Sequence, residues 1–233
     1  MKAVLAALLC SCNLVVAGEF HDESELGVVI TTGNAQSESF NAKQTNSYTW
    51  TKNLLRLQGA YLYSGSNVQV TARHWNSILR YEHEITSRLS GLAAQSAEGD
   101  PFAGYRGRFE TDVGTKYWFN RREKFNWAGE SGYRYMVENR IDSVVVKQRL
   151  LRFYTETNWN WTKSAALKSD VEYLPNLTDP NDYRINGEIE LSVFINDTFS
   201  IKNRYSVAYR NQPPPPAHSR SDTEFTTALA ARF

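Results

Sequence analysis

Acidic side chains recur at alternate positions in several stretches of this chain, where they could support acid–base catalysis. Glu188 and Glu190 form one pair, and Glu110 and Asp112 form another. Two carboxylates on one face of a strand could serve as general acid and general base. However, we expect arginine and lysine residues on the adjacent strands, and opposite charges hold carboxylates ionised. We therefore interpret both pairs as members of salt bridges.

Nucleophilic catalysis would need a serine close to a histidine and an orienting group. The histidines of the chain are His21, His74, His83 and His218. His74 is close in sequence to Ser77, but an odd spacing places two residues on opposite faces of a strand. His83 falls on an apolar face near a strand end, a position typical of a residue at the membrane–water interface. An enzyme that hydrolyses lipids or peptides stays open as an alternative function.

The sequence contains no spacing typical of a metal site, no phosphate-binding glycine loop and no nucleotide motif. Asn176-Leu177-Thr178 matches a glycosylation acceptor by chance, and Asp179 and Asp182 read as turn residues around Pro180. The 26 basic and 25 acidic residues nearly balance, so there is no basic excess typical of nucleic-acid binding. We expect no cofactor, no metal and no nucleic-acid partner.

The stretch 105–119 shows which kind of element would carry the charged residues. Its alternate residues from Tyr105 to Phe119 are mostly apolar or aromatic, and the residues between them are mostly charged. Because successive strand side chains point to opposite faces, the pattern predicts a strand of about 15 residues. A tilted strand needs roughly 9 to 11 residues to span a bilayer, with aromatic residues at both interfaces. The segment is therefore typical of a membrane-spanning strand.

The same alternation predicts about twelve strands, an even number as in bacterial single-chain barrels. Aromatic residues make up 13% of the chain although its mean hydropathy is −0.51, which also favours β structure. The expected strands are 26–32, 37–49, 54–64, 70–85, 88–95, 105–119, 124–137, 145–161, 165–174, 183–195, 198–210 and 222–233.

The expected connections alternate in length along the chain. Those at 50–53, 86–87, 120–123, 162–164 and 196–197 are short, and those at 96–104, 138–143, 175–182 and 211–221 are longer. Short periplasmic turns and long outer loops are expected of a membrane barrel whose termini both face the periplasm. A soluble barrel or sandwich has no reason to sort its loops in this way.

The charged faces of the expected strands would line the barrel interior. They could form a wet pore whose charges select solutes, or a filled interior of mutually paired charges that conducts little. The candidate lumen-lining residues are Arg80, Glu82, Arg106, Arg108, Glu110, Asp112, Lys116, Glu130, Arg134, Arg152, Glu156, Arg184, Glu188, Glu190, Lys202 and Arg204.

The N-terminal segment has the pattern of a secretory signal peptide. Lys2 precedes an apolar run from Ala3, and small residues end at Ala17 before Gly18. A lipoprotein site at Cys12 is the alternative. With cleavage after Ala17, both cysteines leave with residues 1–17, and the mature chain 18–233 has no thiol chemistry. No later apolar run approaches the 18 residues of a membrane helix, so any membrane span must be a strand.

Short motifs in order along the mature chain resemble those of a known family, the salt-stress-induced outer-membrane proteins, grouped as a domain of unknown function. The motifs are Thr31-Thr32-Gly33-Asn34 with Ser37 to Phe40, Asp100-Pro101-Phe102 before Tyr105-Arg106 and Gly114, Gly132-Tyr133-Arg134, and Asp222-Thr223 with the terminal Phe233. The resemblance implies an outer-membrane barrel and supplies no established activity and no catalytic residues.

The sequence thus predicts an all-β protein, with a signal peptide at 1–17 and a single antiparallel transmembrane β-barrel at 18–233. We expect a non-enzymatic monomer in a bacterial outer membrane, exported through the periplasm. Its role would be envelope maintenance or the passage of ions and small solutes, and its other contact would be outer-membrane lipid. An outer-membrane hydrolase and a soluble extracytoplasmic β-barrel are the alternatives.

Overall fold

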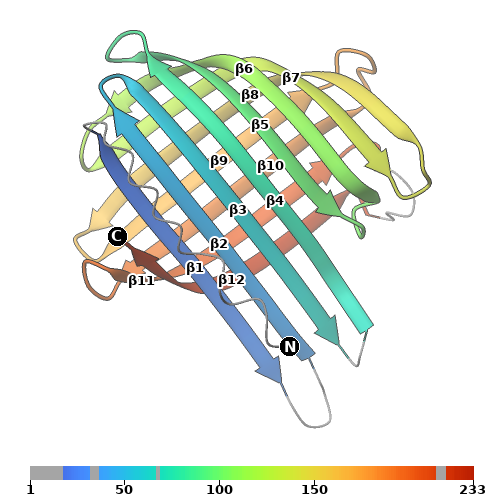
Figure 1. Ribbon diagram of the computed structural model, residues 1–233, viewed down its shortest axis with the longest axis horizontal. Helices are drawn as coiled ribbons and strands as arrows, with labels where there is room; N and C mark the ends of the chain where they lie inside the picture. The colour runs from blue at the N-terminus through green and yellow to red at the C-terminus, as the bar shows by residue number, and fades with distance from the viewer. Residues whose placement is uncertain (1–17, 32–36, 67–68, 214–218) are drawn as a thin grey trace.

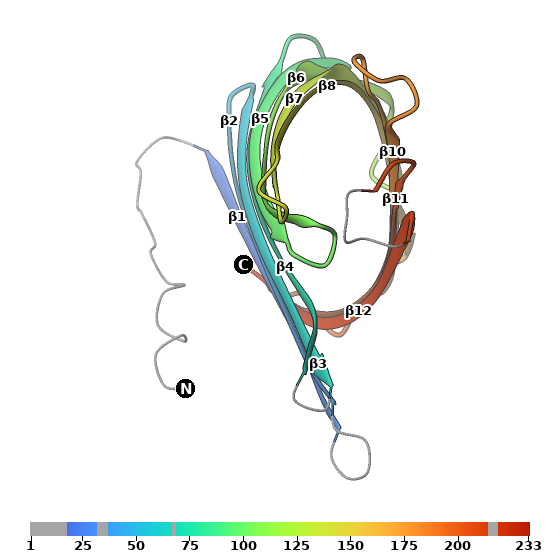
Figure 2. The ribbon, with the colours of Figure 1, turned by 90° about the vertical axis from the view of Figure 1, so that its right-hand side faces the viewer.

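The computed structural model describes residues 18–31, 37–66, 69–213 and 219–233. In this part of the chain, twelve antiparallel strands each pair with the next, and β1 pairs with β12 to close a barrel (Figures 1 and 2). The predicted all-β barrel is confirmed. The strands are β1 Glu19–Thr31, β2 Ser37–Trp50, β3 Asn53–Ser66, β4 Gln69–Glu84, β5 Leu89–Asp100, β6 Tyr105–Arg121, β7 Phe125–Arg140, β8 Val145–Thr162, β9 Ala165–Pro175, β10 Tyr183–Phe194, β11 Phe199–Arg210 and β12 Ser221–Arg232.

Residues 1–17 lie outside the described part of the chain, and so do the signal peptide and the alternative lipoprotein site at Cys12. Among the described residues, no helix has the length and apolar character needed to cross a membrane.

The alternation of side chains separates an apolar outer wall from a charged interior. On β6, Phe109 and Val113 point outward and are 46% and 52% exposed, while Glu110 and Asp112 point inward and are buried. The register of the sheet keeps these faces aligned, because Asp112 lies opposite Arg134 of β7. Each strand therefore contributes one face to the surroundings of the barrel and one to its lumen.

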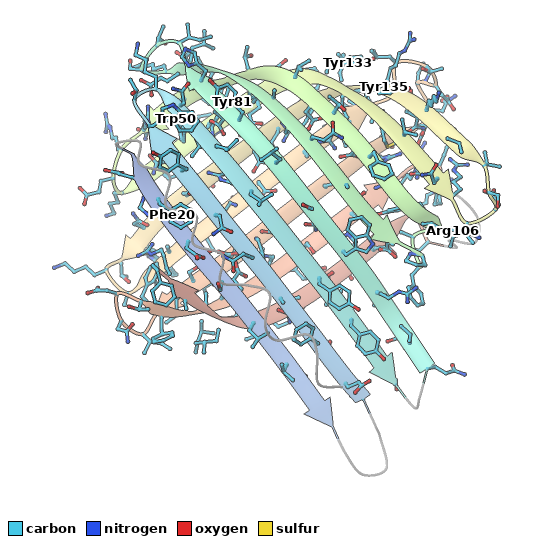
Figure 3. All side chains as sticks on the ribbon, viewed as in Figure 1. Phe20, Trp50, Tyr81, Arg106, Tyr133 and Tyr135 are labelled. Atoms are coloured by element: carbon cyan, nitrogen blue, oxygen red, sulfur yellow. The ribbon has the colours of Figure 1, made fainter. Side chains whose placement is uncertain are left out.

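Aromatic side chains gather on the outer wall toward both ends of the barrel. At the end where β1 begins and β12 ends, Trp50 lies 6.4 Å from Tyr81, and Phe119 lies 4.5 Å from Trp127, between ring centroids. Figure 3 shows Phe20, Trp50 and Tyr81 together at this end. At the opposite end Tyr183 lies 6.1 Å from Tyr173 and 5.8 Å from Tyr209. An apolar band between two aromatic belts is the pattern of a membrane-spanning barrel.

Among the strands that run past their predicted bounds, β1 and β5 do so the furthest. β1 begins at Glu19 instead of Leu26, because Asp22 and Ser24 on its outward face hide the apolar alternation. β5 continues to Asp100, so the predicted loop at 96–104 was wrong over residues 96–100. There the outward residues are the small Ala97 and Gly99, which carry no strand signal.

The connections alternate in length less strictly than predicted. The turn at 51–52 and the loop at 176–182 follow the expected pattern. The loops at 101–104 and 141–144 are no longer than the turn at 85–88, because β5 and β7 extend into the predicted loops. Asp100 closes the 101–104 loop by accepting hydrogen bonds from the backbone N–H groups of Phe102 and Ala103, at 2.9 and 3.0 Å.

The barrel interior is polar rather than apolar. Met136, Leu150 and Leu174 form a small buried hydrophobic cluster. Most other buried inward side chains are charged, including Glu138, which has no exposed surface. The interior is therefore held together mainly by ion pairs, since an unpaired buried charge is costly.

Candidate functional site

The middle of the lumen carries a dense network of ion pairs on the wall formed by β4–β10. Arg134 contacts Asp112 at 2.7 Å, Glu110 at 2.9 Å and Glu172 at 3.2 Å. Glu172 also accepts a hydrogen bond from Arg152 at 2.6 Å. Since each group has a partner of opposite sign, this network fills part of the lumen without leaving a free charge.

The network continues through Glu130 toward the end of the barrel where β1 begins and β12 ends. Glu130 accepts hydrogen bonds from Arg80 and Arg152, each at 2.6 Å. Next to it, Lys116 donates to Glu156 at 2.7 Å, while Arg80 donates to Glu82 at the same distance. The ion pairs therefore link β4, β6, β7 and β8 directly across the lumen.

Glu138 gathers arginine side chains at the outer-loop end of the network. Its carboxylate lies 2.8 Å from Arg108, 3.0 Å from Arg140, 3.1 Å from Arg210 and 3.7 Å from Arg184. Four guanidinium groups thus share one fully buried carboxylate, although Arg108 also contacts Glu98 and Arg210 also contacts Asp182.

A separate cluster joins the two ends of the chain. Lys202 of β11 contacts Glu23 at 2.5 Å and Glu25 at 3.2 Å, both on β1. Arg204 contacts Glu25 at 3.0 Å and Glu188 at 3.1 Å, and it also pairs with Glu190. These pairs connect strands that only barrel closure brings together.

Arg106 differs from the other predicted lumen residues. A β-bulge between Tyr105 and Gly107 shifts the alternation by one residue. Tyr105 is therefore buried in the interior with Arg108 over its ring, although the sequence pattern placed it on the apolar face. Arg106 is exposed near the outer-loop end of β6 and donates a hydrogen bond to the carbonyl of Ile141 at 3.2 Å (Figure 3).

The remaining predicted residues lie on the inward faces of their strands, where they line a cavity or join the networks above. They are Arg80, Glu82, Arg108, Glu110, Asp112, Lys116, Glu130, Arg134, Arg152, Glu156, Arg184, Glu188, Glu190, Lys202 and Arg204.

Two cavities occupy the rest of the lumen. The outer cavity, of 1160 Å³, reaches Phe102 and Pro213 at the outer-loop end. The inner cavity, of 530 Å³, reaches Thr51 and Lys52 in the turn between β2 and β3. Both cavities share lining residues on β2, β3, β6, β8 and β9, so they adjoin one another inside the barrel. The shared residues are Lys43, Arg56, Gln58, Lys116, Glu156 and Lys168.

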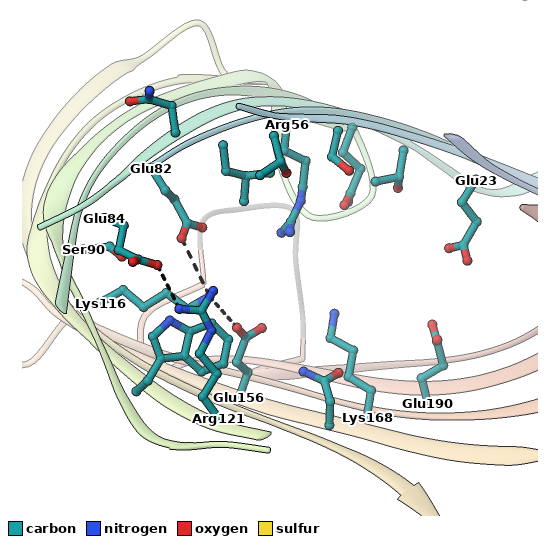
Figure 4. Close-up of a pocket in the computed structure, with 18 of the residues that line it drawn as sticks. Glu23, Arg56, Glu82, Glu84, Ser90, Lys116, Arg121, Glu156, Lys168 and Glu190 are labelled. Atoms are coloured by element: carbon teal, nitrogen blue, oxygen red, sulfur yellow. Dashed lines mark hydrogen bonds and ion pairs between the residues drawn. The ribbon is translucent and has the colours of Figure 1, made fainter. Parts of the chain in front are cut away.

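The junction between the two cavities is positively charged. Lys116 and Glu156 pair with each other there. The other charged residues that line both cavities are the cations Lys43, Arg56 and Lys168, and we call these three residues the basic constriction. Arg56 and Lys168 point toward one another across the open lumen in Figure 4. Neither makes a hydrogen bond or salt bridge within the described residues, and Lys43 lies 3.9 Å from Glu25. Three cations thus face the junction of the two cavities.

These three cations were not among the predicted site residues. Arg56 and Lys168 each alternate with apolar residues on their strands, and this signal could have identified them. Lys43 lies on β2, where the alternation of apolar and polar residues is weak. Glu23 and Glu25, which line the inner cavity, were not predicted because the predicted first strand began only at Leu26.

The histidines do not form a catalytic arrangement in the described part of the chain. His74 points inward, with Nε2 lying 3.7 Å from Glu98, while Ser77 lies on the outward face of the same strand. His83 is exposed and its Nδ1 lies 2.9 Å from Asn53. Nor do the described residues contain a group of three or more side chains suited to a metal ion.

Residues 24–233 match the model of a family described as protein of unknown function, DUF481. The chain is 23% identical over 212 residues to the uncharacterized protein YdiY of Escherichia coli (strain K12), which covers 90% of this chain and 82% of that protein. Among solved structures, it is similar to an outer membrane channel from Pseudomonas putida F1, with a TM-score of 0.56 and 9% identity over 94% of this chain and 97% of the channel.

The NanC porin is a second similar structure, with a TM-score of 0.52 and 8% identity over 91% of this chain and 96% of the porin. At such low identity these likenesses show the fold alone. With the aromatic belts and the family match, they identify a porin-like barrel of the outer membrane.

Proposed function

We propose that this chain, which belongs to the DUF481 family of unknown function, is a narrow, non-enzymatic outer-membrane channel for small anionic solutes. The observation that carries the proposal is that the outer and inner cavities adjoin at shared lining residues, one cavity reaching the outer loops and the other a turn at the opposite end.

The preference for anions follows from the basic constriction. Two unit charges 4 Å apart interact by about 1 kcal/mol in bulk water and by about 4 kcal/mol in surroundings of intermediate polarity. Lys43, Arg56 and Lys168 face the junction, where Glu156 is already paired with Lys116. An anion at the junction would therefore be favoured over a cation, as in pores lined by rings of lysine and arginine.

A structural role in the envelope is the second candidate, favoured by the ion-pair network on β4–β10. Ion pairs across the lumen can stiffen a barrel that conducts no ions. A twelve-stranded barrel is intermediate in size between filled barrels and wide porins. The two candidates differ in conductance, because the structural role needs no continuous water-filled path.

Planar-bilayer recording of the refolded chain 18–233 tests the proposal. Folding is first established by the heat-dependent mobility of the barrel on a gel. We expect discrete conductance steps that carry mainly anions. A folded protein that remains silent would contradict the channel and favour the structural role.

A further inference from the structure

The barrel wall is incompletely closed where its first and last strands meet. β1 and β12 pair only from Glu23 with Arg232 to Leu26 with Leu229, followed by backbone hydrogen bonds between Asp22 and Phe233. In contrast, β1 pairs with β2 along its whole length, and β12 pairs with β11 from Ser221 to Ala231. The outer halves of β1 and β12 therefore have free edges toward each other.

Gly27 marks the point where the two strands separate. A Cβ atom at this position would lie 2.3 Å from the carbonyl oxygen of Thr227, closer than packed atoms approach. Glycine thus lets the backbone of β12 cross close to β1 before the strands diverge. Beyond the crossing, β1–β4 continue as a projecting sheet while β12 curves away with the barrel (Figure 2). We call the opening between residues 27–31 and residues 221–228 the seam.

The outer cavity reaches both strands that border the seam, with Val29 on β1 and Thr226 on β12. Its lining includes inward residues deep in the lumen, such as Arg134, and also Thr223, Phe225 and Thr227 on the outward face of β12. Phe225 is 68% exposed. Because no backbone pairing joins β1 to β12 beyond Leu26 and Leu229, the wall beside this cavity is open at the seam.

A lateral opening at this place needs an occupant or water. Unpaired backbone N–H and C=O groups cost several kcal/mol each in hydrocarbon, and such edges persist only where they line a polar cavity. The seam meets this requirement because its inner side is continuous with the wet, charged lumen.

The chemistry around the seam is apolar outside and acidic inside. Val28 and Phe225 lie on the outward faces of β1 and β12, while Asp222 and Glu224 lie on the inward face of β12. Neither carboxylate makes a hydrogen bond or salt bridge within the described residues. His74, which lines the same cavity from β4, lies 3.7 Å from Glu98. Two unpaired carboxylates therefore face the cavity behind an apolar entrance.

Two exposed arginines also line the outer cavity. Arg73 lies on the outward face of β4, opposite Tyr63, and Arg220 lies at the base of the last loop. The inner side of the seam is thus complementary to positive charge.

We propose that the seam is a lateral port that admits an amphipathic molecule, with its cationic head group at Asp222 and Glu224 and its apolar chain between β1 and β12. This route runs through the barrel wall and does not depend on conduction along the barrel axis.

Fluorescence quenching tests whether acyl chains reach the lumen through the seam. The chain 18–233 contains no cysteine, so Thr226→Cys on the inward face of β12 can be labelled with a small fluorophore. Ser96→Cys, which lines the same cavity from β5, is the matched control on another wall. In liposomes with a nitroxide on the lipid acyl chains, we expect several-fold stronger quenching at position 226 than at position 96.

Equal quenching at the two positions would overturn the port. A water-soluble nitroxide should quench both labels and thereby show that both are accessible. If the Thr226→Cys protein does not fold, Asn41→Cys on β2 provides a second inward position beside the seam. Disulfide-linked dimers of the Thr226→Cys protein would show that the free edge instead pairs with a second copy, which also overturns the proposal.

A second measurement tests the head group. A spin-labelled long-chain amine should quench the label at position 226 at lower concentration than a spin-labelled alkyl sulfate of equal chain length. Glu224→Gln should reduce this preference by about fivefold, the effect of one unit charge at short range in water. Gln95→Glu, which adds an outward carboxylate on β5, should leave it unchanged. Equal quenching by amine and sulfate would refute the cationic head group.

Discussion

Replacing Glu138 with glutamine tests whether the ion-pair network holds the barrel together. Glu138 has no exposed surface, and its carboxylate lies within 4 Å of Arg108, Arg140, Arg184 and Arg210. The amide is nearly the same size, so Glu138→Gln removes one negative charge without opening a cavity.

The expected loss of stability follows from the burial of the charges. Removing one partner of a buried ion pair costs about 3–5 kcal/mol, because the remaining charge stays buried without compensation. Glu84 provides the matched control, since it pairs with Arg121 at the same 2.8 Å but the two side chains are 33% and 54% exposed. An exposed pair contributes about 0–1 kcal/mol. We therefore expect Glu138→Gln to lower the free energy of unfolding by at least about 2 kcal/mol more than Glu84→Gln does.

Urea unfolding of both variants in the same lipid, followed by tryptophan fluorescence and heat-dependent gel mobility, measures this difference. Equal losses for the two variants would refute the reasoning, because burial would then make no difference to the contribution of an ion pair of equal length.

Two further predictions concern the lumen and the barrel wall. Glu156→Gln should release Lys116 from its 2.7 Å pair at the junction of the cavities, so the anion preference in a salt gradient should rise; an unchanged or reduced preference would contradict the assignment of the junction. Gly114→Val should lower the free energy of unfolding by about 1–3 kcal/mol, because a Cβ at Gly114 would lie 2.6 Å from the Ser131 carbonyl oxygen. Gly187→Val is its control, since a Cβ there would meet its nearest atom at an ordinary 3.6 Å, and similar losses of urea stability for the two valines would contradict the close approach of β6 and β7.

Strand alternation predicted the barrel because the outward face must be apolar wherever it meets lipid. The stretch 105–119, whose alternation is the clearest, lies within β6, and the expected even number of strands matches the structure. The prediction was wrong where the outward residues are polar or small, as in the first half of β1 and at the end of β5.

The partners of the lumen charges could not be predicted from the pattern. Lys202 and Glu25 are 177 residues apart in sequence and meet only because β1 and β12 close the barrel. The bulge that moves Arg106 out of the alternation leaves no mark in the periodicity. The basic constriction likewise depends on which cations lack a partner, and this depends on the positions of carboxylates on other strands.

The reversal potential in a salt gradient tests the central claim most directly. The variant Arg56→Gln with Lys168→Gln removes two charges from the basic constriction, and Arg106→Gln removes one from the exposed bulge on β6. At about 1 kcal/mol for each charge, anion occupancy at the constriction should fall by roughly fivefold for each charge removed. The account predicts a channel whose anion preference is largely lost in the double variant and retained in Arg106→Gln. An unchanged reversal potential in the double variant would contradict it.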